Sequence, residues 1–427
     1  MKIEMCNWMG GIRIVAFIGL LSVLEACIRE DYSADLDPDN PTRTVLVYMA
    51  GDNNLSWEVV EKIEALRRGW QWTGNKCLVY VDTPEGACLL RLRGGCQVTP
   101  EAYVETVREY GRENSASAEV FGRVLREVMS DYPADGYGLV FFSHGSGWLP
   151  AGRLQNPSRA SLSGLGEPVR AASSAQGTRS LGWDDGVGED APGSMPHAEM
   201  ELEEFAAAIP DGQLDFIVFE ACLMAGVEVA YVLRGKTDYI LSSAAEIVSP
   251  GFTPIYPSAL RYLFDTSRSV EASLAAFGES YMSHINKLSG DFRSATLSLV
   301  ATKELDLLAA RTRELLAGLS HRPDIISDLQ HFDRPGSYGD SPAVARYFDL
   351  GDWARRIGAQ EQYTVFEEQL KRIVRMKAST ERFLPSQNGF EIRNHSGLTT
   401  YAERSELPAL NAYYRTTAWY KAILGNN

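Results

Sequence analysis

The chain has 427 residues, of which 45% are hydrophobic, and its formal net charge is −15 at pH 7. A chain of this size can bury one large core or two modest ones. The acidic balance argues against a nucleic-acid-binding protein, because such binding rests on basic surface, and it suits an exported protein that meets cationic peptides.

The first 27 residues have the pattern of an export signal. A weakly basic start is followed by an apolar run over 14–24, which is too short to span a bilayer. The run closes on a Leu-Glu-Ala-Cys sequence that resembles a bacterial lipobox, although Glu25 is unusual in one. We therefore predict a signal peptide over 1–27, lipid on Cys27 and a flexible tether over 28–43.

Lipid chains on Cys27 would hold the protein at a membrane surface. The acidic residues that follow Cys27 resemble surface-export signals of Gram-negative lipoproteins. We expect an exported bacterial lipoprotein at the outer membrane or cell surface, and the alternative is ordinary secretion after a degenerate cleavage site.

Strands and helices alternate in the next part of the chain. Buried strands are predicted over 44–49 and 77–81, with a helix over 55–68 between them and another over 118–130. This rhythm predicts a mostly parallel sheet with helices on both faces.

Two further apolar runs, 138–142 and 214–219, lead directly to chemically capable side chains, His144 and Cys222. Ligands of open α/β sheets bind outside the carboxyl ends of the strands. A cysteine attacks as the thiolate, which a nearby imidazole or a helix N-terminus stabilises. The helical pattern of 223–233 predicts that Cys222 lies where a helix begins. The alternatives are a small buried cysteine and a hydrogen-bonded structural histidine.

The residues around these strand ends resemble a known family. His144-Gly145-x-Gly147-Trp148 and Ala221-Cys222-Leu223-Met224 are similar to motifs of the clostripain-like cysteine peptidases, relatives of gingipains, legumains and caspases. Further likeness comes from Tyr-Met-Ala-Gly-Asp-Asn-Asn-Leu over 48–55, from Ala245-Glu246 and from the C-terminal Tyr-Tyr-x-x-Thr-x-Trp.

The resemblance spans roughly residues 44–427 and implies a fold. We expect an α/β, caspase-like three-layer sandwich with a mostly parallel central sheet flanked by helices over 44–265. Beyond it the chain becomes mainly helical, with strand-like segments at 295–300 and 397–401. A mainly helical C-terminal subdomain packed on the sheet is therefore predicted over 266–427.

The resemblance also implies roles for single residues. Cys222 would be the nucleophile and His144 the proton carrier of a dyad, and the backbone N–H groups of Gly145 and Cys222 would stabilise the oxyanion. Glu220 and Glu246 would bind a basic substrate side chain. The family commonly has Asp where this chain has Glu220, and the alternative for Glu220 is a local hydrogen bond at a helix start.

Residues 149–180 form a predicted activation and linker loop between the two strand ends. Its composition, rich in Gly, Pro, Ser, Ala and Arg, is typical of an exposed loop that is easily nicked. The resemblance implies a zymogen that cuts itself after a basic residue here, with the candidates Arg153, Arg159, Arg170 and Arg179. The alternative is an uncut surface insertion.

The sequence contains few patterns that indicate a cofactor or metal ion. The acidic, glycine-rich stretch 181–190 could hold calcium, but a solvated acidic turn is the preferred interpretation. No metal site is predicted, because there is no Cys-x-x-Cys pair for zinc. We expect no required cofactor, with calcium possible. One disulfide among Cys77, Cys88 and Cys96 is possible, although Cys77 is expected to be core.

Two functions from different classes remain open. The first is a cysteine endopeptidase, a monomer that cleaves polypeptides after exposed Arg, with Lys as the second candidate. The second is a surface lipoprotein that keeps the fold as a peptide-binding or scaffolding module. The presence of both His144 and Cys222 favours the enzyme, because a binding module needs neither. A transferase or amidase using the same dyad is a third possibility.

Overall fold

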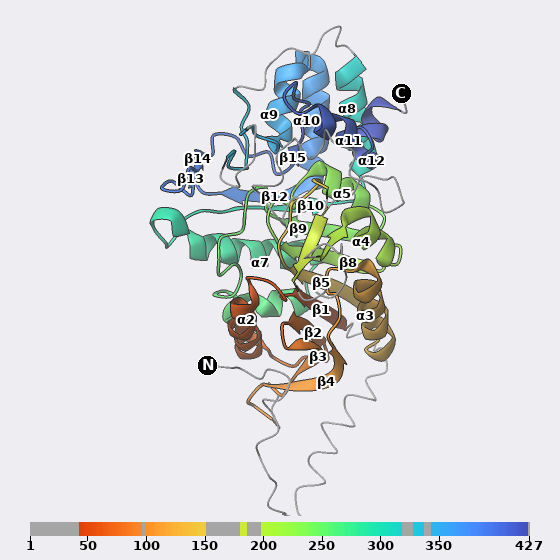
Figure 1. Ribbon diagram of the computed structural model, residues 1–427, viewed down its shortest axis with the longest axis vertical. Helices are drawn as coiled ribbons and strands as arrows, with labels where there is room; N and C mark the ends of the chain where they lie inside the picture. The colour runs from red at the N-terminus through yellow and green to blue at the C-terminus, as the bar shows by residue number, and fades with distance from the viewer. Residues whose placement is uncertain are drawn as a thin grey trace, which may run out of the picture.

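A large sheet forms the middle layer of the protein, as the computed structural model shows (Figure 1). The structure describes residues 42–95, 99–150, 180–185, 198–317, 328–336 and 343–425. Among these residues nine strands form one sheet in the order β12-β10-β9-β8-β5-β1-β2-β3-β4. Their bounds are β1 (Arg43–Ala50), β2 (Lys76–Thr83), β3 (Gly86–Arg93), β4 (Tyr103–Gly111), β5 (Gly136–Phe142), β8 (Leu214–Glu220), β9 (Thr237–Ser242), β10 (Thr296–Ala301) and β12 (Val374–Ser379).

The middle of this sheet is parallel and its margins are antiparallel. Strands β2, β1, β5, β8 and β9 pair in parallel, whereas β3, β4, β10 and β12 join antiparallel. All eight residues of β1 are buried, as a strand covered on both faces requires. The predicted mostly parallel sheet is confirmed.

Helices cover both faces of the sheet (Figure 1). One face carries α2 (Ser56–Gly69), α6 (Tyr256–Ala259) and α7 (Val270–Ile285), and the other carries α3 (Ala118–Asp131), α4 (Leu202–Ala208) and α5 (Val227–Leu233). Side chains of β1 alternate between two cores, with Leu46 and Tyr48 on the α3 side and Val45 and Val47 on the α2 side. The sheet therefore lies between two hydrophobic cores and contributes side chains to both.

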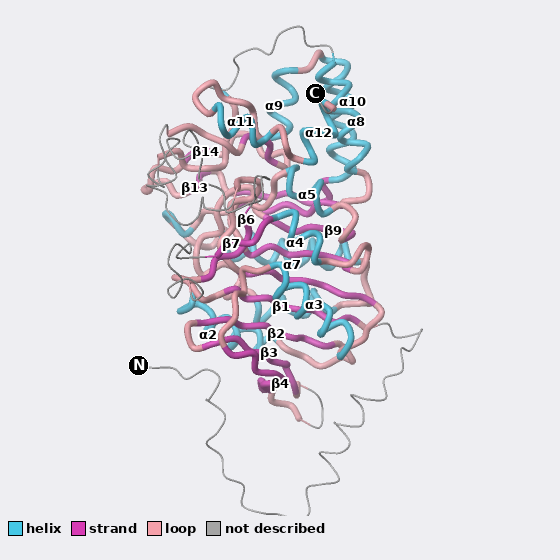
Figure 2. The backbone as a smooth tube through the Cα atoms, turned by 45° about the vertical axis from the view of Figure 1, so that its right-hand side comes forward, coloured by secondary structure: helices cyan, strands magenta, loops and turns pink. Residues whose placement is uncertain are grey.

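A group of helices gathers at one end of the molecule, beyond the strand β9 (Figure 2). It comprises α8 (Leu305–Ala317), α9 (Leu350–Ile357), α10 (Gln360–Ile373), α11 (Pro408–Tyr414) and α12 (Ala418–Leu424). Its buried side chains join the same core as those of α3, α4 and α5. The expected mainly helical C-terminal region is present.

The predicted boundary between residues 265 and 266 needs correction. Strands β10 and β12 follow it in sequence but belong to the central sheet, and α7 packs on the same core as α2. The region 266–427 is therefore part of the sheet layer as well as of the helical end.

Small strand pairs and short 3-10 helices complete the described structure. The pairs are β6 (Ser180–Asp184) with β7 (Ala198–Glu201), β11 (Phe348–Asp349) with β15 (Thr399–Thr400), and β13 (Arg382–Phe383) with β14 (Phe390–Glu391). The 3-10 helices are η2 (Leu260–Phe264) and η3 (Gly290–Phe292). None of the described helices has the length and apolar character that a membrane span requires. The predicted signal peptide lies outside the described residues, as does most of the tether.

Candidate active site

His144 and Cys222 follow two neighbouring parallel strands at the same edge of the sheet. Phe142, at the end of β5, pairs with Glu220, at the end of β8, so His144 and Cys222 each lie two residues beyond a matched pair. A Cβ atom added to Gly145 would lie only 2.8 Å from the carbonyl oxygen of Cys222. The two loops are thus in contact, and glycine is needed at 145 because the neighbouring backbone leaves no room for a side chain.

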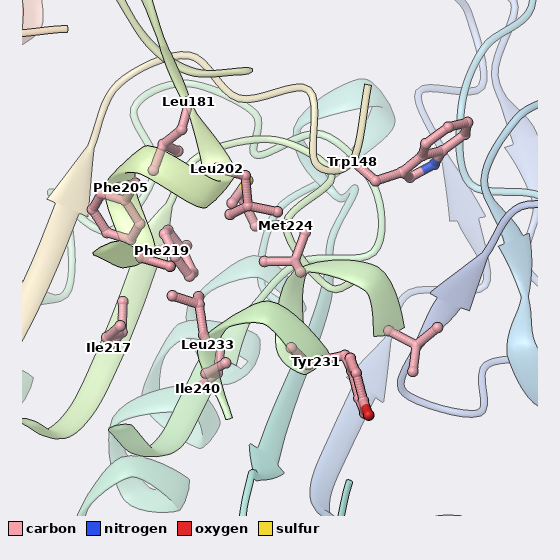
Figure 3. Close-up of a cluster of buried hydrophobic side chains, with 14 of the residues drawn as sticks. Trp148, Leu181, Leu202, Phe205, Ile217, Phe219, Met224, Tyr231, Leu233 and Ile240 are labelled. Carbon is pink, nitrogen blue, oxygen red and sulfur yellow. The ribbon is translucent and has the colours of Figure 1, made fainter. Parts of the chain in front are cut away.

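Buried side chains surround Met224, in the segment that follows Cys222 (Figure 3). Met224 is buried among apolar residues of β8, α4 and α5, including Phe219 and Leu202. Leu223 has a positive φ of 63°, which is strained for a residue with a branched side chain, and its N–H donates to the carbonyl of Ala245 at 3.0 Å. The turn that presents the sulfur is therefore fixed by packing and backbone hydrogen bonds.

The helix after Cys222 begins later than the sequence pattern predicts. Its first residue is Val227, so the segment 223–226 separates the sulfur from the helix N-terminus. No helix therefore begins at Cys222 to stabilise a thiolate there. The group that reaches the sulfur is the N–H of Ile247, which lies 3.4 Å from Sγ.

The imidazole of His144 has one defined hydrogen-bond partner. Its Nε2 lies 2.6 Å from Oδ1 of Asn54, and its ring is 5.3 Å from that of Trp183. An amide oxygen only accepts hydrogen bonds, so Nε2 carries the proton and Nδ1 is the basic nitrogen. Asn54 was not predicted as a site residue, although it lies in the turn after β1, at the same sheet edge, within the motif that carries the family resemblance.

Partial removal from solvent favours the uncharged forms of both Cys222 and His144. It raises the pKa of the Cys222 thiol to about 12, with a further increase from the charge of Glu246. It also lowers the pKa of His144, while the charge of Asp185 opposes that change. Both shifts favour the uncharged forms of these groups, a thiol and a neutral imidazole.

Glu220 lies inside the protein, and this corrects its assignment as a substrate-binding residue. Its side chain is 1% exposed and forms an ion pair with Lys62 at 2.6 Å. Its carboxylate also accepts from the N–H of Phe252 at 2.6 Å and from the hydroxyl of Tyr256 at 2.8 Å. Both oxygens are thus committed to partners from α2, α6 and the turn before α6, and a substrate side chain cannot reach them.

Glu246 lies within electrostatic reach of Cys222 and already binds a cation of the chain. Its two oxygens receive Nε and Nη2 of Arg334 at 3.1 and 2.8 Å, and the two side chains are 14% and 13% exposed. The charge of Glu246 raises the pKa of Cys222 and that of Arg334 lowers it, so both charges lie within electrostatic reach of the sulfur. This carboxylate can hold a guanidinium in the bidentate arrangement that arginine favours.

Three more carboxylates meet beside the histidine loop. One oxygen each of Asp52, Asp82 and Asp184 lies within 4.8 Å of the others. Asp184 belongs to the stretch 181–190 that the sequence marked as acidic, whereas Asp52 and Asp82 were not predicted. Residues 186–190 lie outside the described part of the chain.

Other predicted residues also lie outside the described part. They are the lipidation candidate Cys27, the processing candidates Arg153, Arg159, Arg170 and Arg179, and Cys96. Cys77 is buried in the core as expected.

Comparison with protein families identifies a family that matches most of the chain. The model of the clostripain family, Peptidase_C11, matches residues 47–160 and 162–403. Clostripain of Hathewaya histolytica is 25% identical over 241 residues, which are 50% of this chain. The alignment covers 41% of that relative, so the chain spans less than half the length of the curated protein it matches.

Solved structures resemble this fold over almost the whole chain. An inactive zymogen C11 protease from Parabacteroides distasonis has a TM-score of 0.71 and 28% identity, with 89% of this chain and 97% of that chain covered. A secreted C11 cysteine protease from Bacteroides thetaiotaomicron, in complex with an irreversible peptide inhibitor, has the same TM-score and identity, with 90% and 100% covered.

Proposed function

Because the chain belongs to the clostripain family of cysteine peptidases, we propose that it is an endopeptidase whose catalytic dyad is Cys222 and His144. The observation that carries this proposal is the matched register of β5 and β8, which brings both side chains to one edge of the sheet with their loops in contact. A cysteine peptidase needs its thiol and its imidazole next to the same substrate carbonyl group.

The neutral resting pair favours a general-base route. Nδ1 of His144 takes the proton of the thiol as Sγ of Cys222 attacks the substrate carbonyl, and the N–H groups of Gly145 and Cys222 stabilise the oxyanion. The imidazolium then gives its proton to the leaving amine, and a thioester remains on Cys222. Water, deprotonated by His144, hydrolyses the thioester and restores the thiol. Asn54 holds Nε2–H throughout and so positions the ring.

Cleavage after Arg, with Lys as a weaker second choice, is the proposed specificity. Glu246 is the acid that would bind the substrate cation, and its pairing with Arg334 supports this role because the chain itself places a guanidinium there. A planar guanidinium satisfies both oxygens at once, whereas an ammonium does not. An entering substrate has to displace Arg334.

Maturation and export complete the proposal. Self-cleavage after an arginine between His144 and Cys222 would convert a zymogen to the active enzyme, and a similar protein is described as an inactive zymogen. Another similar protein is described as secreted, which supports export of this one, with lipid on Cys27 as the proposed anchor. Polypeptides with exposed basic residues are the proposed substrates.

The test compares the wild-type chain 28–427 with its Cys222→Ala variant. Peptidase activity is measured with fluorogenic peptides that end in Arg or Lys, and self-cleavage is measured by intact mass. The proposal expects turnover of the Arg peptide and cleavage within 149–180 in the wild type alone. An inactive, uncut wild type would instead favour the peptide-binding module. If both proteins are cut but only the wild type turns over peptide, processing occurs in trans.

A further inference from the structure

We propose that Trp183 is a second positioning residue for the His144 imidazole, one that limits rotation of the ring about its Cβ–Cγ bond. The centres of the two rings lie 5.3 Å apart and their planes are inclined at 52°. This role rests on the proposed function, because the orientation of the imidazole affects turnover only if His144 carries the proton.

The hydrogen bond from His144 to Asn54 leaves one motion of the imidazole weakly restrained. Nε2 is held at 2.6 Å from Oδ1 of Asn54, but Nε2 lies close to the axis of the Cβ–Cγ bond. Rotation about that bond has a broad energy minimum in histidine, and it displaces Nδ1, which lies farther from the axis. Since Nδ1 is the nitrogen that accepts the thiol proton, a packing contact against the ring is needed to restrain this rotation.

The backbone of Trp183 is held on both sides by side chains from the same edge of the sheet. Its N–H donates to Oγ of Ser143 at 3.2 Å, and its carbonyl accepts from Nδ2 of Asn53 at 2.7 Å. Both of these side chains also donate to the carbonyl of Ala50, each at 2.9 Å. Trp183 is therefore fixed to the end of β1 and to the residue that precedes His144.

The residues before Trp183 pair with the histidine loop itself. The N–H of Gly182 donates to the carbonyl of His144 at 3.1 Å, and Leu181 forms an antiparallel bridge with Gly145. Leu181 is fully buried, which anchors this part of β6 in the core. The tryptophan and the histidine thus belong to two segments that are joined by backbone hydrogen bonds.

The indole of Trp183 is also oriented, and it does not serve the core. Its Nε1–H donates to Oδ1 of Asp185 at 2.7 Å. Among the described residues, Trp183 is half-buried and lies outside the hydrophobic clusters, one of which contains Leu181 and Trp148. A large aromatic side chain placed beside the imidazole instead of in the core should contribute more to turnover than to stability.

Steady-state kinetics on an Arg peptide compare the wild-type chain 28–427 with Trp183→Ala and Trp183→Phe. We expect Trp183→Ala to lower kcat by about 10–100-fold, because displacement of a reacting group by about 1 Å can cost about 100-fold in rate, with little change in KM. Trp183→Phe keeps a ring beside the imidazole and should retain most of the wild-type kcat, although it loses the hydrogen bond to Asp185.

The matched control is Trp72→Ala, which removes the same ring from a half-buried position before β2, at the opposite edge of the sheet. This variant should keep the wild-type kcat. Melting temperatures show whether each variant is folded at the assay temperature. A fall in kcat for folded Trp183→Ala that is equally large in Trp183→Phe would overturn the proposal, because the ring itself would then not be what positions His144.

A second measurement does not need turnover. NMR observes the ring nitrogens of His144 in the Cys222→Ala chain with isotopically labelled histidine, and His144→Ala assigns the signals. With Trp183 present, the nitrogen shifts should be those of one tautomer, protonated at Nε2. After Trp183→Ala in the same chain, they should move toward the average of the two tautomers, since the ring can rotate.

The outcomes separate this role from the dyad. Trp183→Ala with the wild-type kcat, or with unchanged nitrogen shifts of His144, would overturn the positioning role and leave the dyad intact. His144→Ala with the activity of the wild type would overturn the dyad and the role of Trp183 together. If the wild type shows no turnover, the nitrogen shifts decide whether Trp183 restrains the ring.

Discussion

In the proposed mechanism, the protonation state of His144 determines how activity depends on pH. The free enzyme needs a neutral imidazole to accept the thiol proton, and burial lowers the pKa of His144 from its usual value of 6.5. Activity is lost as pH falls through this pKa, so the acid limb of kcat/KM for an Arg peptide should have its midpoint below pH 6.5. The Cys222 pKa of about 12 predicts no thiol-dependent limb near neutral pH. A midpoint above pH 6.5 would contradict the neutral pair.

A variant separates positioning of the imidazole from its titration. Asn54→Ala removes the acceptor of Nε2–H, so the ring is free to rotate and to change tautomer. We expect kcat to fall by about 10–100-fold, the range found when the hydrogen-bond partner of a metal-bound histidine is removed, with little change in KM. A variant with unchanged kcat would mean that Asn54 does not orient His144.

The Glu246–Arg334 ion pair predicts that substitutions of its two members change KM in opposite directions. Glu246→Gln should raise KM for an Arg peptide, because the substrate cation loses its partner. Arg334→Gln should lower KM by about tenfold, since displacement of a charge-assisted contact of about 1.5 kcal/mol is no longer needed. Arg293→Gln, at a more exposed ion pair with Glu381, is the control for removal of one positive charge. Equal KM values for all three variants would exclude Glu246 from substrate binding.

For single residues, the sequence identifies the reactive side chains better than it identifies the partners that surround them. His144 and Cys222 were predicted because each follows an apolar strand run. Glu220 was misassigned, because its partner Lys62 is 158 residues away and no local pattern shows that the two meet. Asn54 could have been found by the same strand-end reasoning, since it follows β1, the neighbour of β5.

Among the elements, the contact of α2 with the end of β8 depends on one buried ion pair. Lys62 Nζ binds Glu220 at 2.6 Å and Thr253 Oγ1 at 2.7 Å, and its side chain is fully buried. Glu220→Gln leaves that charge without a counterion, so the free energy of unfolding should fall by about 3–5 kcal/mol. Chemical denaturation measures this loss.

The matched control is Glu64→Gln, which breaks the exposed pair with Arg67 and should cost at most about 1 kcal/mol. The preference of Glu220→Gln for Arg over Lys peptides should match that of the wild type. A changed preference without loss of stability would restore Glu220 to the substrate pocket.

The order of the helices and strands was predictable from the sequence, but their first and last residues were not. Alternating strands and helices follow from the period of the apolar residues, and the structure confirms them. The late start of α5 was missed because Leu223–Gly226 has a helical pattern, yet Leu223 takes a positive φ and the segment bonds to the turn after β9 instead. Tertiary hydrogen bonds overrode local propensity here.

For the whole molecule, the C-terminal region shares a core with the segments that follow His144 and Cys222. Trp148, four residues after His144, is fully buried and its ring lies 4.7 Å from Tyr401 and 5.2 Å from Tyr414. Glu228 of α5 accepts from the hydroxyls of Thr400 and Tyr414 at 2.8 and 3.0 Å. The C-terminal region thus supports the segments that follow His144 and Cys222.

This shared core predicts that the fragment 44–265 does not fold alone. It lacks α7, β10 and β12, whose side chains, including Phe277 and Leu297, fill the core beneath α2. Circular dichroism and denaturation of the fragment should show no cooperative unfolding transition, whereas residues 28–427 should unfold cooperatively. A fragment that unfolds cooperatively would reinstate the boundary between residues 265 and 266.

The most direct test of the proposed dyad is the site of covalent labelling by a peptide with an irreversible electrophile after a C-terminal Arg. Residues 28–427 are treated as wild type and as His144→Ala, and the modified peptide is identified by mass spectrometry. The dyad predicts labelling of the wild type at Cys222 alone, at a rate that falls by at least about 100-fold in His144→Ala. Labelling at Cys77 or Cys88, or equal rates in the two proteins, would contradict it.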